Sequence, residues 1–179
     1  KPSLAEALAN WNVNVIRLSV KSRFWFGLGG KDVPARDDGG KAYQDLVDEV
    51  IETANAGGAY VVLDLHEYKA PTEQHAVFWR DAAARYKNRP GVLFDLLNEP
   101  HDISWDEWRN GGVLKGEARE GVAAENSDAG EVETSIGMQR LLDAVRETGA
   151  RNLVVVGGLD WAYDLSGVRN GYALEDRNG

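Results

Sequence analysis

Short apolar runs alternate along the chain with longer segments in which apolar residues recur at the spacing of a helix. The runs are nearly continuous and rich in β-branched residues, which is typical of strands buried on both faces of a parallel sheet. The four strands predicted in this way span residues 13–19, 59–66, 91–98 and 152–157. Their alternation with helical segments predicts an α/β fold of repeated strand–helix units.

The segments between these runs predict helices over residues 4–9, 41–56, 72–88 and 133–147. The second helix is followed by Gly57-Gly58, and glycine is the usual residue after the last turn of a helix. The third helix is followed by Pro90, which cannot continue it.

The links between the elements differ in length at the two ends of the predicted sheet. Links from a helix to the next strand are very short, whereas those that follow a strand are long and rich in Gly, Trp, His and charged residues. The long links span residues 21–40, 67–71, 102–132 and 158–179. In parallel α/β folds, the loops after the strands build the ligand site, so we expect function at that end. Residues 115–131, acidic and rich in small residues, predict a mobile excursion within the third link.

Polar side chains collect where the predicted strands end. Strand alternation gives Arg17 and His66 orientations that let both point into one barrel mouth. A buried arginine needs a partner, and two roles stay open for Arg17: an ion pair with Asp64 or Asp95 that holds the sheet together, or service in the site. The fourth strand leads into Asp160-Trp161.

The end of the third strand carries the clearest chemical signal. Pro100 cannot donate to a sheet ladder, so the strand stops and presents Asn98 and Glu99 at its tip. One interpretation of Glu99 is an exposed carboxylate in a turn; the other is a functional acid at the ligand-binding end of the sheet.

Composition narrows the possible partners. The 179 residues, 43% of them hydrophobic, suit one domain with a substantial core. A net charge of −9 and a pI near 4.8 argue against nucleic acid and anionic membranes as partners and favour a neutral or cationic ligand. The chain has no cysteine, which excludes a disulfide framework and a thiolate ligand or nucleophile. We found no signal peptide pattern and no apolar span of membrane length.

Three separated motifs, in order, resemble those of glycoside hydrolase family 5, the cellulase-type family of retaining glycosidases. They are NVIRL and LDLH at the ends of two strands, then LLNEPH, and they are followed by VVVGGLDWAYDL. The resemblance covers practically the whole chain, from the family's second strand to the loop after its fifth. It implies a (β/α)8 TIM barrel of which about four strand–helix units are present, so that residues 1–179 form a partial catalytic domain. The implied activity is hydrolysis of a β-1,4-linked glucan by double displacement.

The resemblance also implies roles for single residues. Glu99 is similar to the family's general acid/base, and Asn98 to the asparagine that binds the sugar 2-hydroxyl. Arg17 is similar to the arginine that keeps the nucleophilic carboxylate ionised, and His66 to a histidine that shapes the same pocket.

Aromatic residues in the long links bear on the substrate, because flat rings stack on the apolar faces of sugars. Trp161 matches the family's substrate-contacting aromatic after the fifth strand, and we expect His101 to line the pocket. Trp25 and Trp105 are further predicted substrate contacts, with packing within the loops as the alternative. Trp11 and Trp79 fall on helical faces and are predicted core residues.

The chain departs from the family pattern in one important respect. The retaining mechanism needs a second carboxylate, which the family places in a later Glu-Phe-Gly motif, and this sequence contains no such motif, so no nucleophile is predicted in it. About 250 residues make a whole barrel, so we expect a fragment with two open sheet edges. A sugar-binding protein without catalysis is the first alternative.

A hydrolase that uses Glu99 with a metal is the second alternative. The residues available for a ligand set are His66, Glu67, His75, His101, Asp64 and Asp102. Their spacing matches no zinc pattern, and His75 reads as a surface residue, so no metal is predicted. The glycine pairs lack the context of a dinucleotide site, so no cofactor is predicted either. The expected partner is a polysaccharide or oligosaccharide, with no nucleic acid, membrane or obligate protein partner, and the family habit implies a secreted protein.

Overall fold

The computed structural model describes residues 2–114 and 134–177. The predicted excursion at 115–131 and the first residue of the helix predicted at 133–147 lie outside this range. The larger helices are α1 (Pro2–Asn10), α3 (Lys41–Ala56), α4 (Glu73–Tyr86), α5 (Trp105–Asn110) and α6 (Met138–Glu147). Two short helical segments are α2 (Ser22–Trp25) and η1 (Val168–Tyr172). No described helix has both the length and the apolarity that a membrane span requires.

Four parallel strands form one open sheet in the order β1-β2-β4-β8, as the sequence predicts. They are β1 (Val15–Val20), β2 (Tyr60–Leu65), β4 (Val92–Asp95) and β8 (Val154–Val155). Two small ladders extend the loops after the strands: β3 (Tyr68–Lys69) pairs with β5 (Glu99–Pro100), and β6 (Gly112–Val113) with β7 (Thr134–Ser135). The outermost strands β1 and β8 leave two edges open, which confirms the expected partial barrel.

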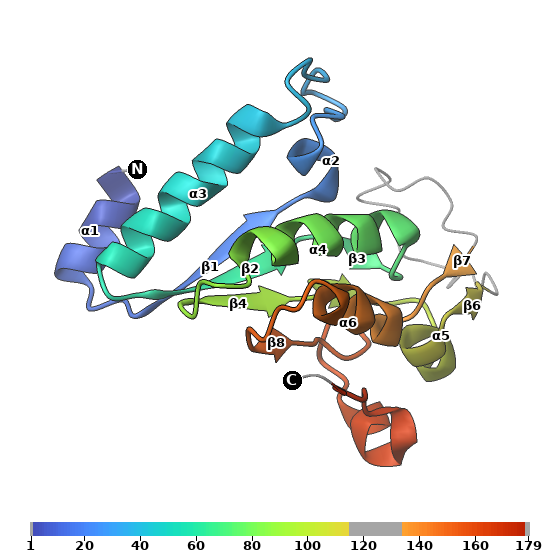
Figure 1. Cartoon of the computed structure of the whole chain (residues 1–179). Helices are drawn as coiled ribbons and strands as arrows, with labels where there is room; N and C mark the ends of the chain where they lie inside the picture. The colour runs from blue at the N-terminus through green and yellow to red at the C-terminus, as the bar shows by residue number, and fades with distance from the viewer. Residues whose placement is uncertain (1, 115–133, 178–179) are drawn as a thin grey trace.

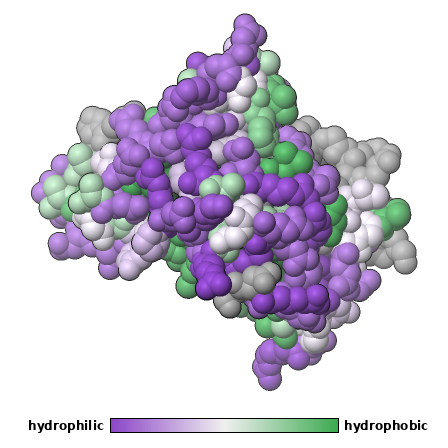
Figure 2. All heavy atoms as spheres, viewed as in Figure 1, coloured by the Kyte–Doolittle hydropathy of each residue, from purple (hydrophilic) through white to green (hydrophobic). Residues whose placement is uncertain are grey.

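Helices cover one face of the sheet and leave the other open (Figure 1). The core lies between α3, α4 and α6 and the covered face, where Leu63 and Phe94 are fully buried. Trp79 of α4 packs on Phe94 with ring centroids 5.4 Å apart and donates its indole N–H to the Leu96 carbonyl. The outer surface of the helical layer is predominantly hydrophilic (Figure 2).

The open face explains why one prediction from the apolar runs is wrong. Those runs predicted burial on both faces, but Val15 and Tyr60 are 50% and 54% exposed on the face that carries no helix. Paired positions on neighbouring strands share that face, and in a closed barrel such positions point into the interior. Continuous hydrophobicity therefore marks these strands as barrel strands even where their inner face is uncovered.

Local signals account for the helix boundaries. Helix α3 has the predicted bounds, and Gly58 follows it with a φ of +82°. Helix α4 begins after Thr72, whose side chain accepts from the His75 amide while the His75 ring accepts from the Thr72 amide. The sequence analysis missed α5, although Ser104 and Glu107 have the spacing of a capping box and form one.

The side chains of His75 and Trp11 lie elsewhere than predicted. His75 was expected at the surface, but it is buried, because the third residue of α4 turns inward to complete the cap. Trp11 was expected in the core, but it is 65% exposed because it follows the end of α1. Trp79 is a core residue, as predicted, and Phe78 and Phe94 are core residues as well.

Candidate active site

Arg17 links three neighbouring strands, β1, β2 and β4, at their carboxyl ends. Its Nε and Nη2 donate to Asp95 Oδ2 over 3.2 and 2.9 Å, and its Nη2 lies 2.9 Å from Asp64 Oδ1. The same Nη2 donates to the Asn98 side-chain oxygen over 2.9 Å. Both roles left open for Arg17 are therefore present together: it pairs with carboxylates of two strands and also reaches the strand tip that carries Glu99.

The two carboxylates beside Arg17 are neighbours in the sheet register. Burial raises the pKa of the Asp95 carboxyl above its ordinary value; hydrogen bonds from Arg17 oppose this shift and the charge of Asp64 adds to it. One guanidinium thus faces two buried acids where the strands end.

His66 lies beside Asp64 at the end of β2. Its Nδ1 is 2.8 Å from Asp64 Oδ2, and the same oxygen accepts a hydrogen bond from the Ser19 hydroxyl over 3.0 Å. The register pairs Ser19 with Asp64, so strand alternation brings Arg17, Ser19, Asp64 and His66 to one face. This placement is the one that their positions along the strands predicted.

Asn98 and Glu99 lie at the tip after β4. The Asn98 amide donates to the Leu65 carbonyl over 3.0 Å, and Glu99 continues into β5, where it pairs with Tyr68. The sheet strand β4 ends at Asp95, earlier than the predicted end at Asn98, and Pro100 is the last residue of the short strand β5. The Glu99 carboxylate, half-buried, makes no hydrogen bond or ion pair with a described residue, so it is available to a ligand.

Tyr68 is a site residue that the sequence analysis missed. Its ring meets His66 edge to face at 5.6 Å, and the Lys21 ammonium lies 5.2 Å from the ring centre. Burial raises the pKa of Tyr68, and the charges of Glu99, Asp64 and Glu67 add to the shift. Its position two residues after His66 was the available signal, because alternate residues of an extended segment share a face.

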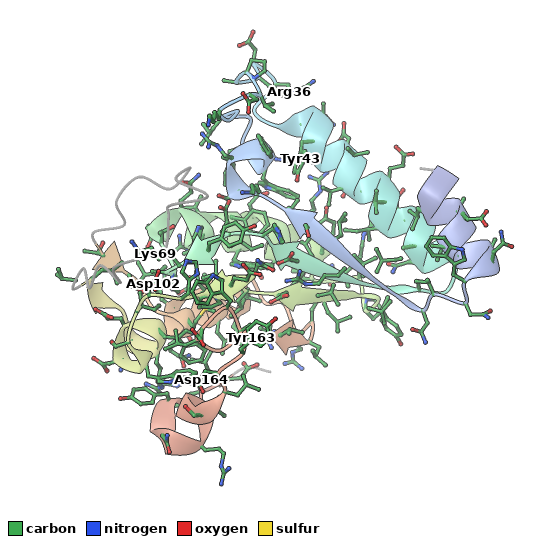
Figure 3. The ribbon with its side chains drawn as sticks, turned by 180° about the vertical axis from the view of Figure 1, so that it is seen from behind. Arg36, Tyr43, Lys69, Asp102, Tyr163 and Asp164 are labelled. Atoms are coloured by element: carbon green, nitrogen blue, oxygen red, sulfur yellow. The ribbon has the colours of Figure 1, made fainter. Side chains whose placement is uncertain are left out.

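A strained turn after β8 carries two aromatic residues, Trp161 and Tyr163. Asp160, Trp161 and Ala162 have φ angles of 53°, 56° and 67°, a left-handed conformation that costs side-chain-bearing residues about 1–3 kcal/mol each. Backbone hydrogen bonds in both directions between Leu159 and Asp164 close the turn. The same segment carries Tyr163 (Figure 3), which is 89% exposed.

The turn is tied to the strand tip through His101. The Trp161 ring stacks on the His101 ring at 4.7 Å and 13°, and the Trp161 amide donates to the Pro100 carbonyl over 3.1 Å. His101 Nδ1 lies 2.8 Å from the Glu99 carbonyl oxygen. The structure thus brings together five of the predicted site residues, Arg17, His66, Asn98, Glu99 and His101, and sets Trp161 against the last of them.

Trp25 does not belong to this site. It is fully buried in α2, where its ring meets Phe78 edge to face at 5.4 Å and its indole N–H donates to Asp81 over 2.7 Å. The prediction that Trp25 contacts substrate is therefore wrong, because its helix turns the ring into the core beneath the loop. Trp105 packs against Trp108 and Tyr172 in α5 and η1, and Gly167 lies close against its ring. Its contact with substrate stays a prediction.

The metal alternative finds no ligand set in the part of the chain that the structure describes. Within residues 2–114 and 134–177, no three His, Asp or Glu side chains are grouped so as to hold a metal ion. Asp64 contacts both His66 and Arg17. The His75 ring accepts a hydrogen bond from the Thr72 amide in the cap of α4.

The family model described as Cellulase (glycosyl hydrolase family 5) matches residues 1–178. The chain belongs to glycosyl hydrolase family 5. Endoglucanase A of Butyrivibrio fibrisolvens is 29% identical over 110 residues, which cover 55% of this chain and 24% of that protein. Endoglucanase 1 of Robillarda sp. is 28% identical over 142 residues, 66% of this chain and 29% of that protein.

A solved family 5 structure has the same fold. XacCel5A in complex with cellopentaose superposes with a TM-score of 0.61 and 25% identity, covering 92% of this chain and 46% of that one. The chain thus spans less than a third of the two curated relatives and about half of the solved one. The strand–helix units described above form a partial (β/α)8 barrel.

Proposed function

We propose that this chain supplies the acid/base side of the active site of a secreted, retaining endo-β-1,4-glucanase. The observation that carries the proposal is the hydrogen bond from Arg17 to the Asn98 side chain, next to Glu99, whose carboxylate pairs with no described residue. Family 5 membership and the endoglucanase relatives support the choice of a β-1,4-glucan.

In this proposal Glu99 first protonates the glycosidic oxygen of the leaving sugar and later removes a proton from the incoming water. Asn98 binds the 2-hydroxyl of the sugar at which the reaction occurs. Arg17 holds the Asn98 side-chain oxygen, so the amide nitrogen, which can only donate, is the end left to face the sugar. This contact strengthens as positive charge develops on the ring in the transition state.

The second carboxylate of the reaction is proposed to come from outside the described residues. A retaining site holds its two carboxyl groups about 5 Å apart. Arg17 can receive such a group, because its side chain is 44% exposed and its Nη1 donates to no described residue. A carboxylate held by this guanidinium would stay ionised, as the nucleophile of a retaining mechanism must be, and Glu99 would be the other carboxyl group of the pair.

The stacked rings of His101 and Trp161 are proposed to bind a sugar beside Glu99. A ring held in place by a second ring, a backbone hydrogen bond and a strained turn loses little freedom when it binds a ligand. The cellopentaose bound in the XacCel5A structure shows that a β-1,4-linked oligosaccharide binds that relative.

The test is Glu99→Gln in the protein at the length its gene encodes. We expect release of reducing sugar from carboxymethyl-cellulose to fall by at least about a hundredfold, the usual contribution of a general acid. An aryl cellobioside with a good leaving group should lose far less in its first step, because that bond breaks without protonation. Glu73→Gln, at an exposed surface ion pair, is the matched control and should keep wild-type rates.

Wild-type turnover of carboxymethyl-cellulose by Glu99→Gln would overturn the acid/base assignment. Binding of cellopentaose without any hydrolysis by the wild-type protein would instead support the sugar-binding alternative. Activity that chelator abolishes and zinc restores would favour the metal-dependent hydrolase.

A further inference from the structure

Asp64 is the most deeply buried acid of the site. Its side chain has no exposed surface, yet three polar groups surround it: the His66 ring, the Ser19 hydroxyl and the Arg17 guanidinium. A buried carboxylate is costly unless it is paired, and a well-packed apolar residue of similar size is often no less stable. The arrangement therefore calls for a reason beyond holding the sheet together.

Comparison with Asp95 isolates what Asp64 does. Both acids lie within 2.9 Å of Arg17 Nη2, on adjacent strands. Only Asp64 also contacts His66, through an oxygen that the Ser19 hydroxyl fixes from the other side. Arg17 would keep a carboxylate partner if Asp64 were removed, whereas His66 would lose the only ring-nitrogen contact that it makes with a described residue.

The chemistry of this contact decides the tautomer of His66. A carboxylate beside a guanidinium has only acceptor sites, so the imidazole nitrogen at 2.8 Å must be the one that carries hydrogen. His66 is thereby held with hydrogen on Nδ1, whereas a free neutral imidazole favours hydrogen on Nε2. The bare Nε2 lies on the far side of the ring from the buried Asp64, and 31% of the side chain remains exposed.

We propose that Asp64 is a positioning residue that fixes His66 as the Nδ1–H tautomer, so that Nε2 presents a hydrogen-bond acceptor to a sugar hydroxyl. The Arg17 guanidinium and the side-chain amide nitrogen of Asn98 are hydrogen-bond donors in the same site. A sugar hydroxyl both donates and accepts, so the Nε2 of His66 supplies the acceptor that these two donors lack. The identity of the ligand rests on the proposed function; the tautomer does not.

The test is nitrogen-15 NMR of the ring nitrogens in the ligand-free protein at the length its gene encodes, followed across pH so that the neutral form is identified. In the wild type we expect the Nδ1–H form to exceed the Nε2–H form by at least about tenfold, the size of a hydrogen bond to a charged acceptor. In Asp64→Ala the Nε2–H form should become the major one. Asp95→Asn, which removes the other acid beside Arg17, should leave the wild-type tautomer in place.

A second variant keeps the test decisive where Asp64→Ala does not fold. Ser19→Ala removes the hydroxyl that holds Asp64 Oδ2 and should lower the excess of the Nδ1–H form without abolishing it. A predominant Nε2–H form in the folded wild type, or an unchanged tautomer in folded Asp64→Ala, would overturn the positioning role.

Cellopentaose then separates this inference from the proposed function. Added to the wild type, it should shift the Nε2 resonance, as an acceptor that gains a hydrogen bond does. The expected tautomer combined with no response to cellopentaose would leave the role of Asp64 standing and count against the glucan proposal.

Discussion

The two faces of the sheet are built from the same strands but have different roles. On the covered face, Leu63 and Phe94 are fully buried under helices and belong to the hydrophobic core cluster. On the open face, the alternate positions of the same strands carry exposed apolar groups at one end and the Arg17 cluster with Asp64 and Asp95 at the other. Stability thus comes mainly from one face, and the candidate chemistry lies on the other.

One strand can contribute to the core and to the candidate site at the same time. Adjacent residues point to opposite faces, so Asp64 stands next to Leu63 and Leu65 in sequence but faces a different environment. The charged groups can therefore be arranged for a ligand while the core keeps its packing. The same division lets each face be tested separately.

The largest effect is expected from truncating a side chain on the covered face. Phe94→Ala should lower the free energy of unfolding by about 3–5 kcal/mol, because it removes a fully buried ring packed on Trp79. Tyr60→Ala, at a 54% exposed position of the open face, should change it by about 0.5 kcal/mol or less. Urea denaturation of the 179-residue chain measures both, and equal losses would break the comparison.

The helical layer should also be sensitive to acid through His75. Burial lowers the pKa of His75 from 6.5 to about 4, so the unfolded chain binds a proton at a higher pH than the folded one. The stability due to the neutral ring is complete above pH 6.5 and is lost as the pH falls towards 4, by about 3 kcal/mol in all. Urea denaturation between pH 7 and pH 4 measures this loss.

Two variants separate the titration of His75 from its capping role. His75→Gln keeps a side chain suited to the third position of a capping box and should remove this part of the acid loss. Thr72→Ala loses the cap itself and should cost about 1 kcal/mol at every pH. An acid loss in His75→Gln as large as that of the wild type would contradict the assignment to His75.

The smallest effect is expected on the open face, where the sign is opposite. Because burial raises the pKa of Asp95, its protonated form favours folding. The stability that the protonated Asp95 contributes is complete below pH 3.8, the ordinary pKa of an aspartate, and is lost as the pH rises through the raised pKa. The hydrogen bonds from Arg17 oppose the shift and so limit the size of this contribution. Asp95→Asn should therefore gain stability relative to the wild type as the pH rises from 3.5 to 7. A difference between the two that stays constant, or changes the other way, would argue against a raised pKa.

The sequence by itself determined the parts of this protein that depend on local pattern. The bounds of α3 and the positions of the four strands follow from apolar periodicity and from glycine. Strand alternation was enough to put Arg17 and His66 on one face, and three separated motifs in order, the last of them around Glu99, were enough to suggest the family. Each of these strands, helix ends and motifs is a run of residues close together in the chain.

Tertiary structure alone decided which partner each side chain meets. The pairing of Arg17 with both acids depends on the register of three strands, and the stacking of Trp161 on His101 depends on a strained turn sixty residues away from that histidine in sequence. Burial of Trp25 and His75 likewise depends on how α2 and the first turn of α4 orient their side chains, which periodicity over a few residues does not fix. Contacts between residues far apart in sequence depend on the packing of the whole sheet, and the pattern of neighbouring residues does not specify that packing.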